Sequence, residues 1–250
     1  MINLRKAIPL ATLMVILVAV AAGADENAKE LPRGKKLIEF GWDIPDTGYL
    51  RKHVPLMEKT PFDGCVFQAS YQAPDGAGGS FSWEGWGTKP FSREHLASTI
   101  NDLKAVSGNR FSHHFLRFNT TPAKLDWFDD YSAILNNARV AAEMARESGI
   151  PGILFDIEQY EGQLFNYKEQ QHADTKSWDE YATLVRQRGW EVMQAFQQGY
   201  PGITAILTYT HCLPYRRAKG DFSRLPETEY GLLVPFVDGL VDATDSVTVQ

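Results

Sequence analysis

Short apolar runs alternate with longer amphipathic segments along most of the chain, and this alternation is the strongest constraint on its fold. The amphipathic segments predict helices, and the short runs are typical of buried strands. Strands that are repeatedly followed by helices indicate βα units around a mainly parallel sheet. The predicted strands are 37–42, 64–68, 111–118, 152–157 and 203–209, and the predicted helices are 47–59, 92–106, 127–148 and 177–198.

Local signals support two of the helix boundaries. Ser177 and Glu180 have the spacing of a capping box, in which each side chain accepts from the other residue's backbone amide. Gly149 and Gly199 each follow a helical pattern, and we expect both to end their helices in a left-handed conformation.

The pattern continues after the fifth strand, where 226–241 is predicted to be helical and 246–249 to begin a sixth strand. A closed (β/α)8 barrel needs eight strands. We therefore expect a TIM-like barrel that is truncated after about five to six βα units. A smaller open α/β sheet is the alternative.

The first residues have the layout of a secretory signal peptide, because Arg5 and Lys6 precede the apolar run 7–22 and small residues end at Ala24. An uncleaved membrane anchor is the alternative, since a span takes about 20 apolar residues. We expect cleavage and a secreted or periplasmic protein that has no membrane contact afterwards. The expected divisions are a signal peptide at 1–24, a linker at 25–36 and a barrel domain at 37–250.

Net charge limits the kinds of binding partner that we expect, and cysteine content limits the disulfides. Removal of 1–24 takes away two basic residues and changes the formal net charge from −6 to −8, which argues against nucleic acid and anionic membranes as partners. Cys65 and Cys212 are too few for a disulfide framework. We expect two buried free thiols, with a single bridge as the alternative.

The segment 74–90 is rich in glycine and carries Trp83 and Trp86. It matches neither nucleotide-binding fingerprint, so we expect a long loop and no cofactor. Its tryptophans either stack on a sugar ring or pack within the loop.

Candidate functional residues are the polar and aromatic side chains that follow the predicted strands, because barrels place their active sites at the carboxyl ends of the strands. They are Trp42, Asp43, Gln68, Arg117, Asn119, Asp156, Glu158, Tyr160, Tyr209 and His211. His113 and His114 open a strand instead, and we expect them to be structural.

Asp156 and Glu158 are two positions apart at the end of one predicted strand, so their side chains point the same way. Two carboxylates in a partly enclosed site repel each other, which favours the protonated form of one of them. Glycoside hydrolysis needs such an acid together with a second group that stabilises an oxocarbenium-like transition state.

The segment 152–160, GILFDIEQY, resembles the strand-four signature of chitinase-like glycoside hydrolases, Asp-Gly-x-Asp-x-Asp-x-Glu, which tyrosine often follows. The resemblance implies that Glu158 is the general acid and that Asp156 orients the substrate's acetamido group. Pro151 and Leu154 stand where the family has its first two aspartates. A nucleophile on a later strand, beyond Gln250, is the mechanistic alternative.

Each candidate also has a structural interpretation. Asp156 could form a salt bridge with Arg117, while Arg117 and Asn119 could bind sugar hydroxyls or neutralise the acidic pair. Trp42 and Tyr209 could form sugar platforms or pack in the core, and His211 could be a hydrogen-bond donor or second acid. The chain lacks metal-binding and serine-hydrolase motifs, so we expect no metal.

The sequence therefore predicts a secreted glycosidase that uses Glu158 as general acid/base and Asp156 as its helper on a poly- or oligosaccharide substrate. The alternative is a glycan-binding barrel without catalytic activity, which the two missing aspartates favour.

Overall fold

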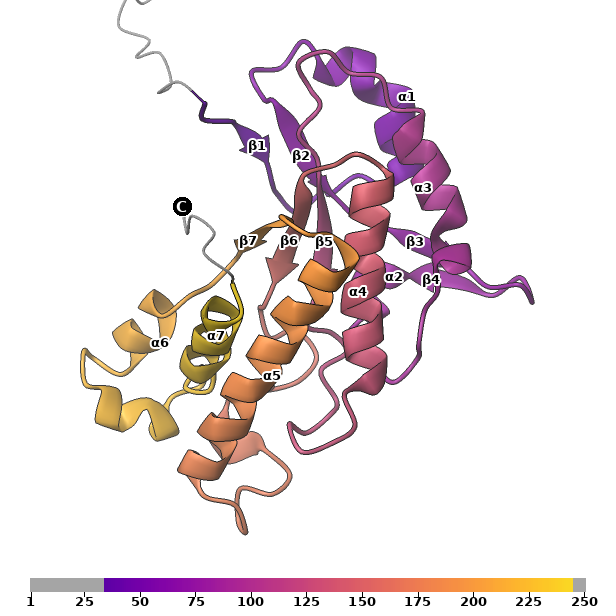
Figure 1. Ribbon diagram of the computed structural model, residues 1–250. Helices are drawn as coiled ribbons and strands as arrows, with labels where there is room; N and C mark the ends of the chain where they lie inside the picture. Colours follow the sequence, from indigo (N-terminus) through magenta and orange to yellow (C-terminus); the bar gives the residue numbers. More distant parts are fainter. Residues whose placement is uncertain (1–33, 245–250) are drawn as a thin grey trace, which may run out of the picture. The chain divides into compact units, whose positions relative to one another are not determined.

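The computed structural model describes residues 34–244, and the central feature of this part is a curled, half-barrel sheet of five parallel strands (Figure 1). Each strand pairs in parallel with its neighbour, as repeated βα units require. The sheet confirms the expected α/β class and the five predicted strand positions. In spatial order, the strands are β1 (Ile38–Glu39), β2 (Gly64–Phe67), β5 (Phe115–Asn119), β6 (Gly152–Asp156) and β7 (Thr204–Leu207).

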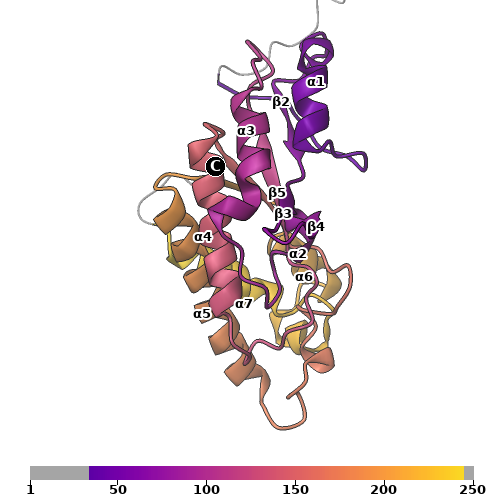
Figure 2. The same cartoon turned by 90° about the vertical axis from the view of Figure 1, so that its right-hand side faces the viewer.

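Helices follow the strands and lie mainly on one side of the sheet (Figure 1). The longer ones are α1 (Thr47–Met57), α3 (Ala97–Lys104), α4 (Ser132–Glu147), α5 (Trp178–Gly199) and α7 (Leu233–Asp242). Helix α5 packs against both α4 and α7. Figure 2 shows α3, α4 and α5 on the side of the sheet that these helices cover. Within residues 34–244, no helix combines the length and apolar character that a membrane crossing needs.

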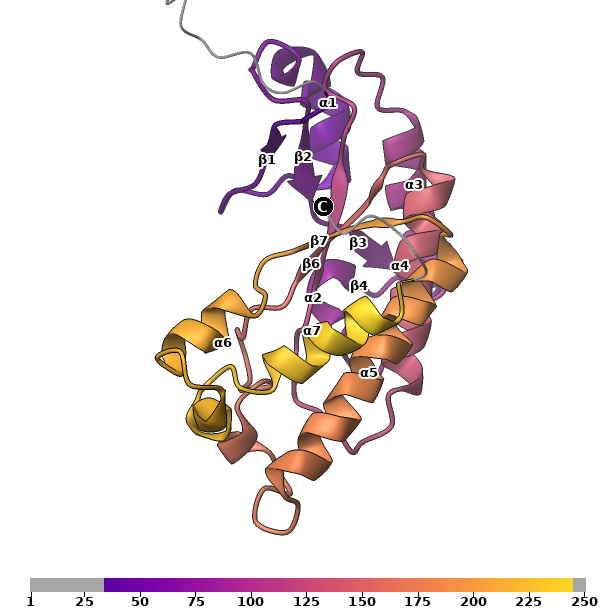
Figure 3. The same ribbon diagram turned by 60° about the vertical axis from the view of Figure 1, so that its left-hand side comes forward.

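Smaller elements fill the connections after β2, β6 and β7. The segment predicted as a loop at 74–90 contains part of an antiparallel hairpin and a short helix. Beyond the end of β7 lies α6, as Figure 3 shows. These elements are β3 (Ser70–Gln72), β4 (Gly78–Ser80), α2 (Phe81–Glu84), α6 (Cys212–Arg217) and the 3-10 helices η1 (Arg93–Leu96), η2 (Tyr167–Glu169) and η3 (Phe222–Glu227).

The helix-facing side of the sheet forms the main hydrophobic core. Side chains alternate between the faces of a strand, and Phe118 and Phe155 point to this side, where both are fully buried with Trp86, Phe196 and Phe236. Their rings make tilted and edge-to-face contacts, such as the 5.5 Å separation of the Phe155 and Phe196 centroids. Burial of these rings is the main source of stability on this side.

The opposite side of the sheet carries a much smaller apolar cluster. It consists of Ile44, Val66, Phe115 and Leu154, with Ile38 and Ile206 partly buried against it. Polar side chains follow this cluster toward the carboxyl ends of the strands, because Arg117 and Asn119 continue the alternation from Phe115. The two sides of the sheet therefore have different chemistry.

Among the predicted boundaries that differ from the structure, the starts of three elements show the clearest shifts. The helix predicted from 127 begins at Ser132 because the Asp126 carboxylate holds a loop, accepting from the Phe128 amide at 3.0 Å and the Tyr181 hydroxyl at 2.8 Å. The strand predicted from 111 begins at Phe115, since the amides of the residues at 112 and 113 donate to the Asp63 carbonyl. The helix predicted from 226 begins at Leu233.

The helix signals are confirmed in part. Ser177 and Glu180 form the capping box, and Gly149 follows α4 with a φ of +70°. The left-handed expectation for Gly199 is wrong, because Tyr200 caps α5 in an extended conformation and Gly202 adopts the positive φ. A side chain at Gly199 would collide with the backbone of Arg139, so this glycine allows α5 to approach α4.

The cysteines are both free thiols, and they differ in exposure. Cys65 is buried in β2, as expected, and burial raises the pKa of its thiol to about 12. The expectation of burial is wrong for Cys212, which is exposed at the start of α6 rather than in a strand. The predicted signal peptide and most of the predicted linker, as well as the predicted strand at 246–249, lie outside the described residues.

Candidate functional site

The candidate site lies at the carboxyl ends of β5 and β6, where Asn119 and Asp156 are register partners. Phe155 faces the helices, so the alternation turns Asp156 to the other side of the sheet, together with Arg117 and Asn119. Strand β6 ends at Asp156 rather than at 157. Glu158 therefore extends from the loop that follows the strand.

Asp156 is fully buried and paired with Arg117. Its Oδ2 accepts from Arg117 Nε at 2.9 Å and Nη2 at 2.5 Å, and from the Tyr160 hydroxyl at 3.0 Å. The Arg117 side chain is itself only 11% exposed. Because the guanidinium neutralises Asp156, the expected repulsion between two carboxylates is replaced by a buried ion pair beside Glu158.

Glu158 is half-buried and is held by two tyrosines from different segments. Its Oε2 lies 2.7 Å from the Tyr160 hydroxyl, and its Oε1 lies 3.1 Å from the Tyr209 hydroxyl. Burial, with the hydrogen bond to Glu158, raises the pKa of Tyr160. Burial, with the Glu158 charge, raises the pKa of Tyr209. Both tyrosines therefore stay neutral phenols near pH 7 and keep a proton to donate.

Tyr160 links the two carboxylates. Its oxygen lies within hydrogen-bond distance of Asp156, Glu158 and Arg117 Nη2, the last at 2.8 Å. A phenol carries one proton, so Tyr160 donates to one carboxylate at a time. The Tyr160 hydroxyl therefore connects Asp156 to Glu158, and a movement of Asp156 would alter the hydrogen bond at Glu158.

Trp83 covers this group of side chains. Its ring lies 4.8 Å from the Arg117 guanidinium carbon and 4.9 Å from the Tyr160 ring in an edge-to-face arrangement. Helix α2 carries Trp83, and Thr121 fixes it by donating to the Trp83 carbonyl at 2.8 Å. Trp86, three residues on, is fully buried in the core. The sequence presented the two tryptophans as equivalent, whereas only Trp83 lies at the site.

Tyr230 lies near the site and carries no distinctive sequence signal. Tyr230 accepts from the Gln159 amide at 3.2 Å, and its ring lies 5.8 Å from that of Tyr209. Gln159 in turn accepts from the Phe165 amide at 2.6 Å. These contacts fix the loop that carries Glu158. Tyr230 follows η3 in an irregular segment, so neither spacing nor periodicity indicated it.

Asn119 is fully buried beside Asp156, and neither its Oδ1 nor its Nδ2 has a hydrogen-bond partner within residues 34–244. Asp156 Oδ1 is also buried without a partner there. Most buried polar groups in proteins are hydrogen-bonded. Within residues 34–244 these three atoms are among eight buried side-chain atoms without a partner, and they belong to two residues that are register partners.

Four predicted site residues are not brought to the carboxylates. Trp42 and Asp43 are exposed after the edge strand β1, which β2 and β5 separate from β6. Gln68 donates to the Ile44 carbonyl at 3.2 Å. His211 Nε2 pairs with Asp238 Oδ1 at 2.8 Å. His114, by contrast, is buried as expected of a structural residue, and burial lowers its pKa to about 4.

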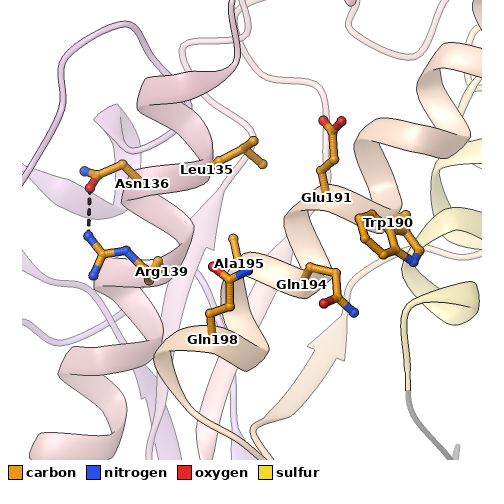
Figure 4. A pocket seen from close by; sticks show the side chains of 8 residues that line it. All are labelled: Leu135, Asn136, Arg139, Trp190, Glu191, Gln194, Ala195 and Gln198. Atoms are coloured by element: carbon orange, nitrogen blue, oxygen red, sulfur yellow. Dashed lines mark hydrogen bonds between the residues drawn. The ribbon is translucent and has the colours of Figure 1, made fainter.

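Other surface features are separate from this site. In the part of the chain that the structure describes, no group of three or more His, Cys, Asp or Glu side chains could hold a metal ion. A groove of about 300 Å³ lies between α4 and α5 (Figure 4), and none of the candidate residues lines it. Its lining residues are Leu135, Asn136, Arg139, Trp190, Glu191, Gln194, Ala195 and Gln198.

Comparison with known proteins does not identify a family for this chain: no protein-family model, no curated protein and no solved structure matches it.

Proposed function

We propose that the protein is a glycoside hydrolase of the secreted or periplasmic space, which cleaves a poly- or oligosaccharide with Glu158 as general acid/base. The observation that carries the proposal is the setting of Glu158. Its carboxylate is half-buried at the carboxyl end of a parallel strand, and two tyrosine hydroxyls fix its direction. General acid/base catalysis requires such a positioned carboxyl group.

Asp156 supports Glu158 indirectly in this proposal. Its Oδ2 orients Tyr160, which also contacts Glu158. Arg117 keeps Asp156 in place, and the exposed faces of Trp83 and Tyr160 offer apolar surface with polar edges to a sugar ring. The resemblance of 152–160 to the chitinase-like signature supports the same assignment for Glu158.

The half-barrel sheet supports a (β/α)8 architecture as part of the proposal. Five parallel strands in sequential order, covered by helices on one side, are the arrangement that a TIM-like barrel repeats eight times. The candidate residues lie at the carboxyl ends of the strands, where such barrels place their active sites.

The test compares the wild type with Glu158→Gln and with Glu161→Gln in the full chain. Glu161 is an exposed carboxylate three residues farther along the chain, paired at 3.7 Å with Lys124, and serves as the matched control. Each protein is incubated with hexasaccharides of β-1,4-glucose, β-1,3-glucose and β-1,4-N-acetylglucosamine, and products are followed by mass spectrometry. We expect cleavage by the wild type and by Glu161→Gln, and a loss of about 1,000-fold or more in Glu158→Gln. Unchanged turnover in Glu158→Gln contradicts the assignment.

A glycan-binding protein without catalytic activity is the second candidate. The burial of Asp156 and its ion pair with Arg117 favour it, because the helper carboxylate does not face a substrate. Binding of one hexasaccharide by the wild type, without any product after prolonged incubation, would support this second candidate over the first.

A further inference from the structure

Three unpaired polar atoms are buried together at the carboxyl ends of β5 and β6. They are Asn119 Oδ1, Asn119 Nδ2 and Asp156 Oδ1, and both residues are 0% exposed. The residues are register partners on neighbouring strands. A buried donor or acceptor without a partner destabilises the folded state, so these three atoms oppose folding instead of supporting it.

The same chain contains a matched asparagine whose side chain is fully bonded. Asn137 is also 0% exposed. Its Oδ1 accepts from the Phe91 amide at 2.8 Å, and its Nδ2 donates to the carbonyls of Gly85 and Lys89, both at 2.9 Å. The Asn119 side chain, by contrast, makes no hydrogen bond within residues 34–244.

Three partly exposed side chains, Arg117, Tyr160 and Trp83, contact one another beside Asp156. Arg117 and Tyr160 both bind Asp156 through Oδ2 and leave Oδ1 free. The Trp83 ring lies 4.8 Å from the Arg117 guanidinium carbon. None of these contacts uses Asp156 Oδ1 or the side chain of Asn119, so a shift of Arg117 and Tyr160 would break hydrogen bonds to Asp156 only at Oδ2.

We propose that Asn119 and Asp156 form a specificity subsite that recognises one hydroxyl group of a glycan. A hydroxyl is both donor and acceptor, so it can donate to Asp156 Oδ1 and accept from Asn119 Nδ2. Trp83, Arg117 and Tyr160 form the cover that moves when the sugar enters. A sugar that lacks this hydroxyl leaves the buried pair unpaired, which is the strongest form of discrimination by a binding site. The inference rests on the proposed function for its ligand class.

The first experiment measures thermal stability and needs no ligand. Asn119→Leu replaces the unpaired amide with an apolar side chain of similar size, and we expect the melting temperature to rise by about 2–4 °C. Asn137→Leu breaks four hydrogen bonds, the three given above and the one that Asn137 Oδ1 accepts from Asn136 Nδ2 at 3.2 Å, and should lower the melting temperature by several degrees. A fall in Asn119→Leu comparable to that in Asn137→Leu overturns the inference, because it means that Asn119 is structural.

The second experiment measures binding in the Glu158→Gln background by calorimetry, with the same three hexasaccharides as probes. We expect Asn119→Leu to weaken the binding of the preferred hexasaccharide by about 100-fold or more. Unchanged binding overturns the subsite while leaving the proposed function intact. If no hexasaccharide binds and none is cleaved by the wild type, the proposed function fails together with the hydroxyl assignment, whatever the melting temperatures show.

Discussion

The two sides of the parallel sheet differ in the size of their apolar core and in the polar side chains that they carry. The helix-facing side is closed by large buried rings around Phe118 and Phe155. The opposite side has a small apolar cluster and then Arg117, Asn119 and Asp156, where a buried ion pair lies beside Asn119. Buried polar atoms without a partner within residues 34–244 occur on both sides, since Trp86 Nε1, Tyr131 Oη and His114 Nε2 on the helix-facing side also lack one. The difference indicates that one side supplies most of the apolar packing, while the other side carries the candidate site.

The largest expected effect on the free energy of unfolding comes from a comparison of substitutions at two adjacent residues of β6. Phe155→Ala should lower the free energy of unfolding by about 3–5 kcal/mol, because it leaves a cavity in the main aromatic core. Leu154→Ala, on the other side, should lower it by only about 2 kcal/mol, since its cluster is small. Urea unfolding monitored by circular dichroism gives both values. An equal or larger loss in Leu154→Ala would show that the two sides are equally important for stability.

Disruption of the buried ion pair between Arg117 and Asp156 gives the next largest expected effect on stability. Arg117→Met leaves the Asp156 carboxylate buried without its cation, and we expect a loss of about 3 kcal/mol in the free energy of unfolding. The double variant Arg117→Met/Asp156→Leu removes both charges and should recover most of this loss. Urea unfolding of the three proteins is the measurement. A double variant that is no more stable than the single one would contradict a buried pair.

His114, on the helix-facing side, predicts a dependence of stability on pH. Burial lowers its folded-state pKa from 6.5 to about 4, so below pH 6.5 the unfolded chain takes up a proton that the folded protein does not. The stability that the neutral imidazole contributes is present above pH 6.5 and is lost as the pH falls toward 4. Between pH 6.5 and 5 the loss is about 2 kcal/mol.

The variant His114→Phe isolates this contribution, since it lacks the titrating group and keeps the other charged residues. Its free energy of unfolding should fall less than that of the wild type between pH 6.5 and 5, as measured by urea titration at each pH. Parallel curves for the two proteins would mean that His114 is protonated equally in both states.

Trp42 gives the smallest effect. Its side chain is fully exposed after the edge strand β1, so Trp42→Ala should change the free energy of unfolding by less than about 0.5 kcal/mol. Thermal unfolding of the variant checks this value. A larger loss would mean that Trp42 belongs to a packed surface.

Periodicity predicted the sheet well and the loops poorly. The five strand positions follow from short apolar runs, and the capping box placed the start of α5, because these signals are local. The start of α4 could not be predicted, since Asp126 holds the preceding loop through Tyr181, 55 positions away. Gly199 has the local signal of a helix stop, yet its close approach to Arg139 determines its role.

The part of the candidate site that lies at the strand ends could be predicted from the sequence. Asp156, Glu158, Arg117, Asn119, Tyr160 and Tyr209 do come together, because parallel strands bring their carboxyl ends to one edge. Trp83 and Tyr230 reach the site from a hairpin-flanked helix and an irregular segment, and their positions depend on tertiary contacts. The sequence also could not show that Arg117 covers Asp156 while leaving one of its oxygens unpaired.

The most direct test of the account is a crystal structure of the full chain with Glu158→Gln, soaked with the hexasaccharide that it binds. We expect a sugar ring at the carboxyl ends of β5 and β6, against Trp83 and within hydrogen-bond distance of the residue at position 158. We also expect one sugar hydroxyl between Asn119 and Asp156. A sugar bound in the groove between α4 and α5, with the site around position 158 unchanged, would contradict the account.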